Sequence, residues 1–189
     1  MTTYRLSLTP HTIESAHDGA RPLLEKAHKE LGFVPNMYAR MAQQPGLLES
    51  YSAGYDAFRT QSGFSPPEQE VVLITISRDN KCRYCVAAHS MIGKNMTKVP
   101  DDVLTALRSG ASIPNPRFSA LSVFTSAMLA SHGSPSPEQV AAFLSAGFEE
   151  KHVLAIILAI GVKTMSNYAN HVFDTPIDAA FTAFDWSPK

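Results

Sequence analysis

Cysteine is scarce in this chain. Only two of its 189 residues are cysteines, Cys82 and Cys85. A secreted scaffold held by disulfides needs more cysteines at wider spacing, and a disulfide across so short a loop removes little entropy from the unfolded chain. In a reducing compartment, a lone close pair indicates redox chemistry or metal binding.

An excess of charge of either sign is also lacking. The chain has 16 Lys and Arg against 17 Asp and Glu, a net charge of -1, which gives no electrostatic basis for binding nucleic acid or an anionic membrane. No stretch approaches the roughly 18 consecutive apolar residues of a membrane span. The longest apolar run, Val153 to Val162, predicts a buried helix. Because Met1 to Pro10 lacks the pattern of a secretory signal, we expect a cytoplasmic protein.

The chain does have enough apolar residues for a sizeable core, at 44% hydrophobic. Strand signals are weak, whereas apolar residues recur at helical spacing between regular turn signals. We therefore expect an all-α, compact helical bundle forming a single domain over residues 1–189. A loose echo between Ser65-Pro66-Pro67-Glu68-Gln69 and Ser134-Pro135-Ser136-Pro137-Glu138-Gln139 allows two related halves, about residues 20–110 and 111–189.

Caps and breakers set the expected helix bounds. The two proline-containing segments just named each read as a capping box, and glycines mark several helix ends. The expected helices run from about Leu23 to Gly32, Met37 to Gln43, from Pro45 past Phe58, Pro66 to about Ser77, Cys82 to about Lys94, Pro100 to Gly110, Asn115 to Gly133, Ser136 to Gly147, and Glu149 to about Phe173. Residues 176–189 are expected to be irregular or a short helix.

The spacing of the cysteines suits reversible oxidation. Residues three apart on a helix share a face, with α-carbons about 5 Å apart, which lies within the range of an unstrained disulfide. The pair is expected in the first helical turn, where unpaired N–H groups and the helix dipole favour a thiolate. His89 follows Cys85 by four residues, so its imidazole can take the thiol proton or hold the thiolate.

Glu70 is the candidate partner of His89. It lies on the preceding expected helix, twelve residues before Cys82, and a short loop makes the two helices neighbours. A buried carboxylate there could orient His89 or pass on a proton. Glu68 competes for this role, but the capping box already accounts for it.

Three other interpretations of these residues stay open. The cysteines could be inert core residues, or they could bind zinc with His89 and a fourth ligand such as Glu70 or His171. Glu70 could be an ordinary solvated helix residue. The usual haem attachment motif is excluded, because Val86 follows Cys85 where that motif has histidine.

Glu70 followed by Cys82-x-x-Cys85-x-x-x-His89 resembles the signature of the alkyl hydroperoxidase D and carboxymuconolactone decarboxylase superfamily. The resemblance covers about residues 20 to 185. It implies an all-helical fold that assembles as trimers or hexamers. Three further stretches resemble the peroxidase-related branch, namely Leu31 to Asn36, Pro45 to Leu48, and Asn167 to His171.

The resemblance also implies roles for the site residues. Cys85 matches the cysteine that peroxide oxidises to a sulfenic acid. Cys82 matches the cysteine that resolves it to a disulfide and exchanges with an external reductant. His89 and Glu70 match the proton relay. One position departs from the pattern, because Tyr84 stands where well-studied members have histidine, so the relay is shorter here or Tyr84 only shapes the pocket.

A second polar cluster lies near the end of the last expected helix. His171 and Asn167 could face the cysteine pair across the core or across a subunit boundary, and the alternative for His171 is a satisfied core histidine. Tyr168 reads as a packing residue. Trp186 reads as an anchor for the end of the chain.

The leading hypothesis is therefore a thiol-dependent peroxidase that acts on a hydroperoxide. No flavin, haem or nicotinamide motif is present, so no cofactor is expected and the electrons must come from a thiol or dithiol reductant, either a partner protein or a small dithiol. One alternative is a disulfide reductase or adaptor for another peroxidase. A second is a decarboxylase-like acid–base enzyme, and a third is a metal-binding or oligomeric interaction module.

Overall fold

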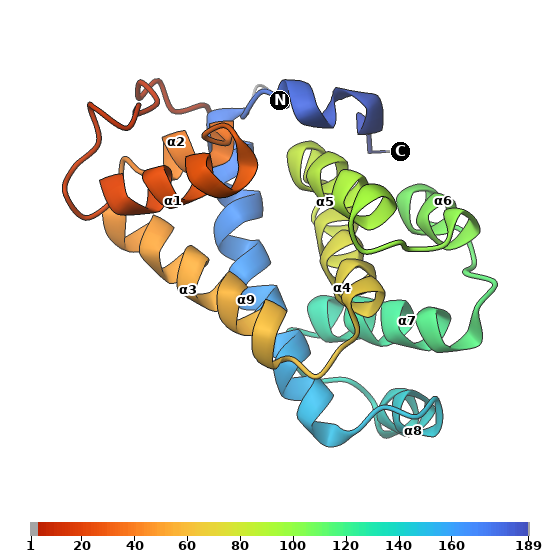
Figure 1. Cartoon of the computed structure of the whole chain (residues 1–189). Coiled ribbons are helices and arrows are strands. Elements are labelled where there is room, and N and C mark those ends of the chain that lie inside the picture. The colour runs from red at the N-terminus through yellow and green to blue at the C-terminus, as the bar shows by residue number, and fades with distance from the viewer. Residues whose placement is uncertain (1–3, 189) are drawn as a thin grey trace.

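The computed structural model describes residues 4–188, and within that range it contains helices and no strand. Figure 1 shows α9 running through the middle of the molecule, with α1 to α3 on one side and α4 to α7 on the other. The elements are α1 (Arg21–Leu31), α2 (Asn36–Met41), α3 (Pro45–Gln61), α4 (Pro66–Asp79), α5 (Arg83–Asn95), α6 (Asp101–Ser109), α7 (Pro116–Ala130), α8 (Pro137–Ser145), α9 (Glu150–Phe173) and the 3-10 helix η1 (Ala179–Phe184). The expected all-α class is confirmed.

The observed helix ends lie close to those predicted from capping residues, prolines and glycines. The capping box predicted at Ser65 is present, with the Ser65 backbone N–H donating to Glu68 Oε2 at 2.8 Å. The other oxygen of Glu68 accepts a hydrogen bond from Arg117 Nε at 2.6 Å, so Glu68 has a structural role. A second capping box starts α8 at Ser136.

Two hydrophobic clusters form the core. One is built on α4 with α6, α7, α8 and the first half of α9. The other joins α1 to α3, the start of α5 and the second half of α9, and it contains Cys82 and Cys85. Both clusters draw on residues before and after position 110, and the division into two related halves stays a prediction.

Helix α9 is the longest element. By length and hydropathy alone it could cross a membrane, with a mean hydropathy of 1.3 in its most apolar window. Half of that window is buried against the rest of the chain, which also suits a central core helix. Helix α3 packs closely on it at Gly54, where an added Cβ would lie 2.8 Å from Val162 Cγ2. This close approach brings the tyrosines of α3 beside the second half of α9.

Candidate active site

The cysteine pair sits at the turn between α4 and α5. Lys81 adopts a left-handed conformation with φ of 59°, and the Cys82 N–H donates to the Ser77 carbonyl at 2.8 Å, closing the end of α4. Cys82 is then the N-cap of α5, and Cys85 is its third residue. Both are buried free thiols, and both lie in the first turn, as predicted.

Glu70 and His89 meet inside the protein. Glu70 on α4 is completely buried, and its Oε2 lies 3.0 Å from His89 Nδ1 on α5. Its Oε1 lies 2.5 Å from Arg59 Nη2, which also donates to the Tyr55 hydroxyl at 2.5 Å. Burial alone would raise the pKa of Glu70, but His89 and Arg59 outweigh it and hold the pKa below its ordinary value. Glu70 is therefore a buried carboxylate and not a solvated helix residue.

Lys163, which was not predicted from the sequence, completes this chain of contacts. It lies on α9 with a completely buried side chain, and its Nζ is 3.0 Å from His89 Nε2. A carboxylate can only accept hydrogen bonds and an ammonium can only donate them. His89 must therefore carry its proton on Nδ1, donate it to Glu70, and accept from Lys163 through Nε2. Burial and the adjacent Lys163 lower the pKa of His89, which keeps the imidazole neutral.

Polar groups of α9 also surround the Cys85 sulfur. Asn170 Nδ2 lies 3.3 Å from Cys85 Sγ and 3.8 Å from Cys82 Sγ, and Ser166 Oγ lies 3.9 Å from Cys85 Sγ. Burial opposes ionisation of Cys85, but Cys82 and Lys163 together hold its pKa well below the usual thiol range. The neighbouring Cys85, and then burial, raise the pKa of Cys82. Cys85 is thus the thiolate of the pair.

A count of charges leads to the same assignment. The buried network holds two cations, Arg59 and Lys163, and one carboxylate, Glu70. An unbalanced charge in a protein interior is costly, so the network is most stable with one more anion. The thiolate of Cys85 supplies it.

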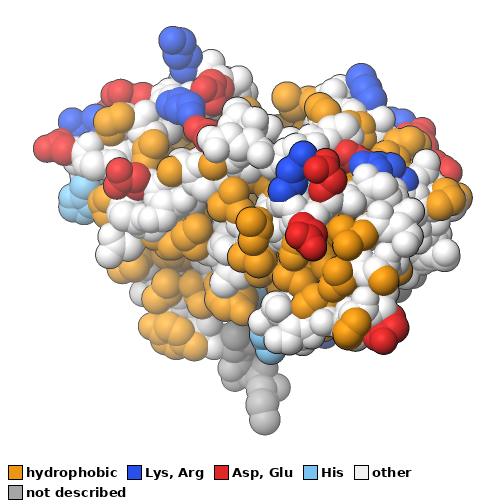
Figure 2. Space-filling view, turned by 90° about the horizontal axis from the view of Figure 1, so that it is seen from below, with side chains coloured by type: hydrophobic (Ala, Val, Ile, Leu, Met, Phe, Trp, Pro, Cys, Tyr) orange, Lys and Arg blue, Asp and Glu red, His pale blue; other side chains and the backbone are white. Residues whose placement is uncertain are grey.

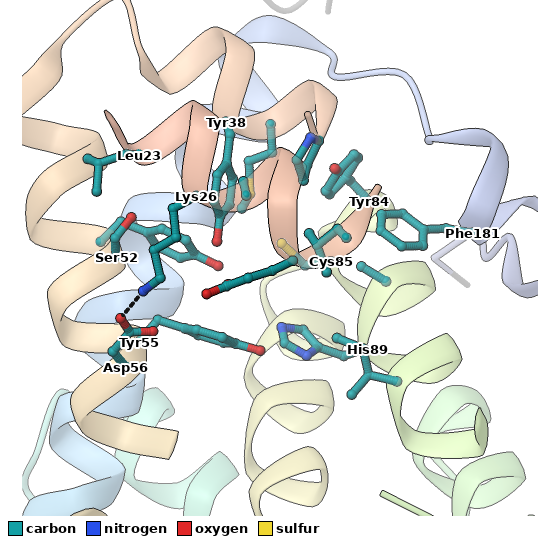
Figure 3. A pocket seen from close by; sticks show the side chains of 18 of the residues that line it. Leu23, Lys26, Tyr38, Ser52, Tyr55, Asp56, Tyr84, Cys85, His89 and Phe181 are labelled. Carbon is teal, nitrogen blue, oxygen red and sulfur yellow. Dashed lines mark hydrogen bonds and ion pairs between the residues drawn. The ribbon is translucent and has the colours of Figure 1, made fainter. Parts of the chain in front are cut away.

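A cavity of about 180 Å³ opens at Cys85. Figure 3 shows Cys85 and His89 at one side of it, with Tyr55 reaching across from α3 toward His89. At the mouth, the exposed Lys26 of α1 and Asp56 of α3 form an ion pair at 2.7 Å. Four tyrosines line the cavity, namely Tyr38, Tyr51, Tyr55 and Tyr84.

The tyrosines give the cavity a neutral aromatic wall. The rings of Tyr38 and Tyr51 lie 5.7 Å apart between centroids, and those of Tyr51 and Tyr55 lie 5.8 Å apart. Burial raises the pKa of Tyr55 to about 12, and it also raises the pKa of Tyr38 and Tyr51. The phenols therefore stay protonated and can donate hydrogen bonds to a bound molecule.

The remaining predicted residues lie at the edge of the site or outside it. Tyr84 lines the cavity, but its hydroxyl donates to Asp178 Oδ2 at 2.5 Å, away from the Glu70–His89 pair. Asn167 is buried and accepts from Asn80 Nδ2 at 2.9 Å. His171 is exposed at the end of α9, and Asn170 is the residue of that cluster that reaches the sulfurs.

Two further residues named from the sequence lie outside the site. Tyr168, predicted to pack rather than to take part in the chemistry, is 59% exposed. Trp186 does anchor the end of the chain, with its Nε1 donating to the Arg108 carbonyl at 2.7 Å. Within residues 4–188, no group of three or more His, Cys, Asp and Glu side chains could hold a metal ion.

Replacing Glu70 with glutamine should destabilise the protein by about 3 kcal/mol near neutral pH, because it leaves the Arg59 cation buried without its anion. The pKa of Glu70 is lower in the folded protein than its ordinary value of 4.5. The stability from the ionised carboxylate is therefore fully present above pH 4.5 and is lost as the pH falls through the lower folded value. Urea unfolding at pH 7 and in acid measures this difference.

The exposed Glu25 offers a matched control, since Glu25→Gln should change stability by less than about 0.5 kcal/mol at either pH. A Glu70→Gln protein as stable as the wild type at pH 7 would contradict the buried ion network.

The comparisons with known proteins agree with the resemblance seen in the sequence. Residues 45–126 match the carboxymuconolactone decarboxylase family, a region that includes Glu70, the cysteine pair and His89. No curated protein sequence matches the chain significantly.

Several solved structures share the fold over almost the whole chain. An uncharacterized peroxidase-related protein from Ralstonia eutropha JMP134, described as an alkylhydroperoxidase AhpD core, has a TM-score of 0.83 at 22% identity, covering 96% of this chain and 97% of that one. A peroxidase-related protein from Silicibacter sp. TM1040 has a TM-score of 0.78 at 21% identity, with 96% and 97% covered. A cysteine-to-alanine variant of the debrominase Bmp8, in complex with 2,3,4-tribromopyrrole, has a TM-score of 0.76 at 18% identity, with 95% and 96% covered. At these identities the likeness establishes the fold, and the debrominase shows that the fold supports more than one activity.

Proposed function

We propose that this chain, which matches the carboxymuconolactone decarboxylase family over residues 45–126 and has the alkylhydroperoxidase D-like fold, is a thiol-dependent peroxidase. One observation carries the proposal. The Cys85 sulfur lies at the wall of a buried cavity, beside the Lys163 ammonium and the second thiol of Cys82. A thiolate so placed can attack a small electrophile that enters the cavity.

The first step breaks the O–O bond of a hydroperoxide. The Cys85 thiolate attacks the terminal oxygen and becomes a sulfenic acid, and an alkoxide leaves with the electron pair of the broken bond. Lys163 is the buried cation beside the sulfur, so it protonates the alkoxide to an alcohol. The Glu70–His89 pair fixes the position of Lys163 through His89 Nε2.

The second step forms the disulfide. The Cys82 thiol attacks the sulfenic sulfur of Cys85, and the thiol proton leaves with the hydroxyl group as water. Two thiol equivalents then return two electrons and two protons, which restore both cysteines. The cycle needs no bound cofactor, and the reducing cytoplasm is the compartment we propose for it.

The wall of the cavity favours a small organic hydroperoxide. Its tyrosine rings present apolar surface and neutral hydroxyl donors, and its 180 Å³ would leave hydrogen peroxide loosely held. Consumption of tert-butyl hydroperoxide with dithiothreitol tests the function directly. If neither this nor other hydroperoxides are consumed faster than without protein, while the disulfide still exchanges with thiols, the protein is a disulfide reductase and the peroxidase proposal fails.

We also propose that the protein works as a homo-oligomer, as the resemblance implies. An apolar stripe of large exposed side chains follows α9, made of Leu154, Ile157, Leu158, Tyr168 and Val172. Seen from below, hydrophobic side chains cover much of the face that holds α8 and the first turns of α9 (Figure 2). A second copy of the chain is the partner we assign to the stripe, because an unpartnered apolar helix face of this length is unusual on a monomer.

Ile157→Glu should therefore lower the mass of the particle measured by light scattering to that of one chain, because it places a charge in the stripe. Val123→Glu is the matched control, since Val123 is equally apolar and 63% exposed but lies on α7. A wild-type protein that is already monomeric at micromolar concentration would rule out this interface.

A further inference from the structure

The two sulfurs of the site differ in how they can be reached. Cys85 lines the cavity, whereas Cys82 is completely buried and is absent from the cavity wall. Thiol–disulfide exchange requires the incoming thiolate to approach one sulfur along the S–S axis. A thiolate that enters through the cavity therefore reaches the sulfur of Cys85.

The tail of the chain holds the two residues that follow Cys82. The Tyr84 hydroxyl donates to Asp178 Oδ2 at 2.5 Å, and the Tyr84 and Phe181 rings pack edge to face at 5.9 Å. Arg83 is paired with Asp185 at 2.5 Å. These contacts hold residues 178–185 against the start of α5, as the ribbon crossing above α5 in Figure 1 shows.

From this arrangement we infer that the reductant of the Cys82–Cys85 disulfide is a low-molecular-weight thiol that enters the cavity and attacks Cys85, with Cys82 as the leaving group. The inference rests on the proposed function and reverses the role that the resemblance implies for Cys82. A cavity of about 180 Å³ admits a small thiol, whereas the folded surface of a protein dithiol cannot enter it.

Leaving-group strength alone favours attack on Cys82, because Cys85 is the thiol with the lower pKa, but access to the two sulfurs favours attack on Cys85. The pKa of Cys82 is raised in the reduced protein chiefly because of its contact with Cys85. In the disulfide both sulfurs are bonded, so Cys85 is not a thiolate and does not raise the pKa of Cys82. Asn170 Nδ2, at 3.8 Å from Cys82 Sγ, can then donate to the departing Cys82 thiolate.

The exchange balances in two steps. A small thiolate bonds to Cys85 Sγ, the Cys82–Cys85 bond breaks, and Cys82 leaves with the electron pair and takes a proton. A second small thiolate attacks the sulfur of the first, which releases an oxidised small disulfide and the Cys85 thiolate. Two thiols are oxidised and the protein disulfide is reduced.

The test starts from protein oxidised with diamide, so that it does not depend on peroxide chemistry. Reduction is followed with 2-mercaptoethanol, glutathione and thioredoxin, each corrected for its thiolate concentration. We expect 2-mercaptoethanol to react at least ten times faster than glutathione, and thioredoxin to be the slowest. Trypsin cleaves after Lys81, Arg83 and Lys94, so it separates the two cysteines, and mass spectrometry of acid-trapped protein should find the mixed disulfide on the Cys85 peptide.

Two cavity variants sharpen the test. Ala88→Leu narrows the cavity wall and should slow reduction by 2-mercaptoethanol at least fivefold, whereas Ala53→Leu, on the exposed face of α3, should leave it unchanged. Tyr38→Ala widens the cavity and should speed reduction by glutathione.

Thioredoxin acting fastest, or a mixed disulfide on the Cys82 peptide, would overturn the inference. Failure of the peroxidase proposal alone would look different, because the diamide-formed disulfide would still be reduced through Cys85.

Discussion

Replacing Cys85 with serine is expected to lower the rate of hydroperoxide consumption by at least about 1000-fold, because the hydroxyl is not ionised near neutral pH and the thiolate is the attacking group. Stopped-flow measurement of tert-butyl hydroperoxide loss, with dithiothreitol as reductant, gives this rate. Cys82→Ser is the matched variant, since Cys82 lies in the same helical turn and is equally buried.

The two variants should differ in kind. Without added reductant, Cys82→Ser should react once with the hydroperoxide and then accumulate a sulfenic acid on Cys85, because no neighbouring thiol can resolve it. Labelling with dimedone detects that acid by mass spectrometry. Dimedone labelling of Cys82 in the Cys85→Ser protein, with none in Cys82→Ser, would exchange the roles of the two cysteines.

The helices could be predicted because their ends depend on local chemistry. The serine and glutamate of a capping box and the glycine after a helix act on neighbouring residues, so the sequence carries the whole signal. Glu70 and His89 were predicted for a similar reason. A tight turn at Lys81 makes α4 and α5 neighbours, which brings their facing side chains together.

The contribution of α9 could not be predicted in the same way. This helix is apolar on most sides, so its sequence does not fix which face turns toward the cysteines. Asn167 and His171 share one face, yet Asn170 is the residue that reaches the sulfurs. The rotation of α9 depends on packing against α3 at Gly54, which is a tertiary contact without a local signature.

Tyr84 illustrates the same limit. Its place before Cys85 indicated either a relay or a pocket role, and only the position of Asp178 in the tail separates the two. That contact spans 94 residues of sequence.

Lys163 was visible in the sequence as a lone cation beside a long apolar run, and a second large effect is expected from it. Lys163→Met should raise the pKa of Cys85, because an adjacent cation favours the charged thiolate. The thiolate fraction near neutral pH, and with it the peroxidase rate, should fall by about 100-fold on loss of this one cation. The rate should recover as the pH rises, since the thiolate forms above the pKa.

Absorbance of the thiolate at 240 nm against pH measures this shift directly in a Cys82→Ser background, where Cys85 is the sole cysteine. Lys163→Arg keeps the charge but changes the geometry, so it should retain most of the thiolate and only part of the activity. If the titration of Cys85 is the same in Lys163→Met as in the parent protein, the cation does not hold the thiolate.

Stability separates this role from a structural one. Without Lys163, the buried network contains Arg59 and Glu70, whose charges cancel, and a neutral Cys85 thiol then leaves no buried charge unbalanced. Methionine fills a similar volume without the cost of burying an ammonium group. Lys163→Met should therefore melt at the same temperature as the wild type or higher, while it loses activity. If Lys163→Met lowered both the melting temperature and the activity, Lys163 would be a residue that maintains the fold. If it lowered the activity alone, the buried cation serves to ionise Cys85, although its burial destabilises the protein.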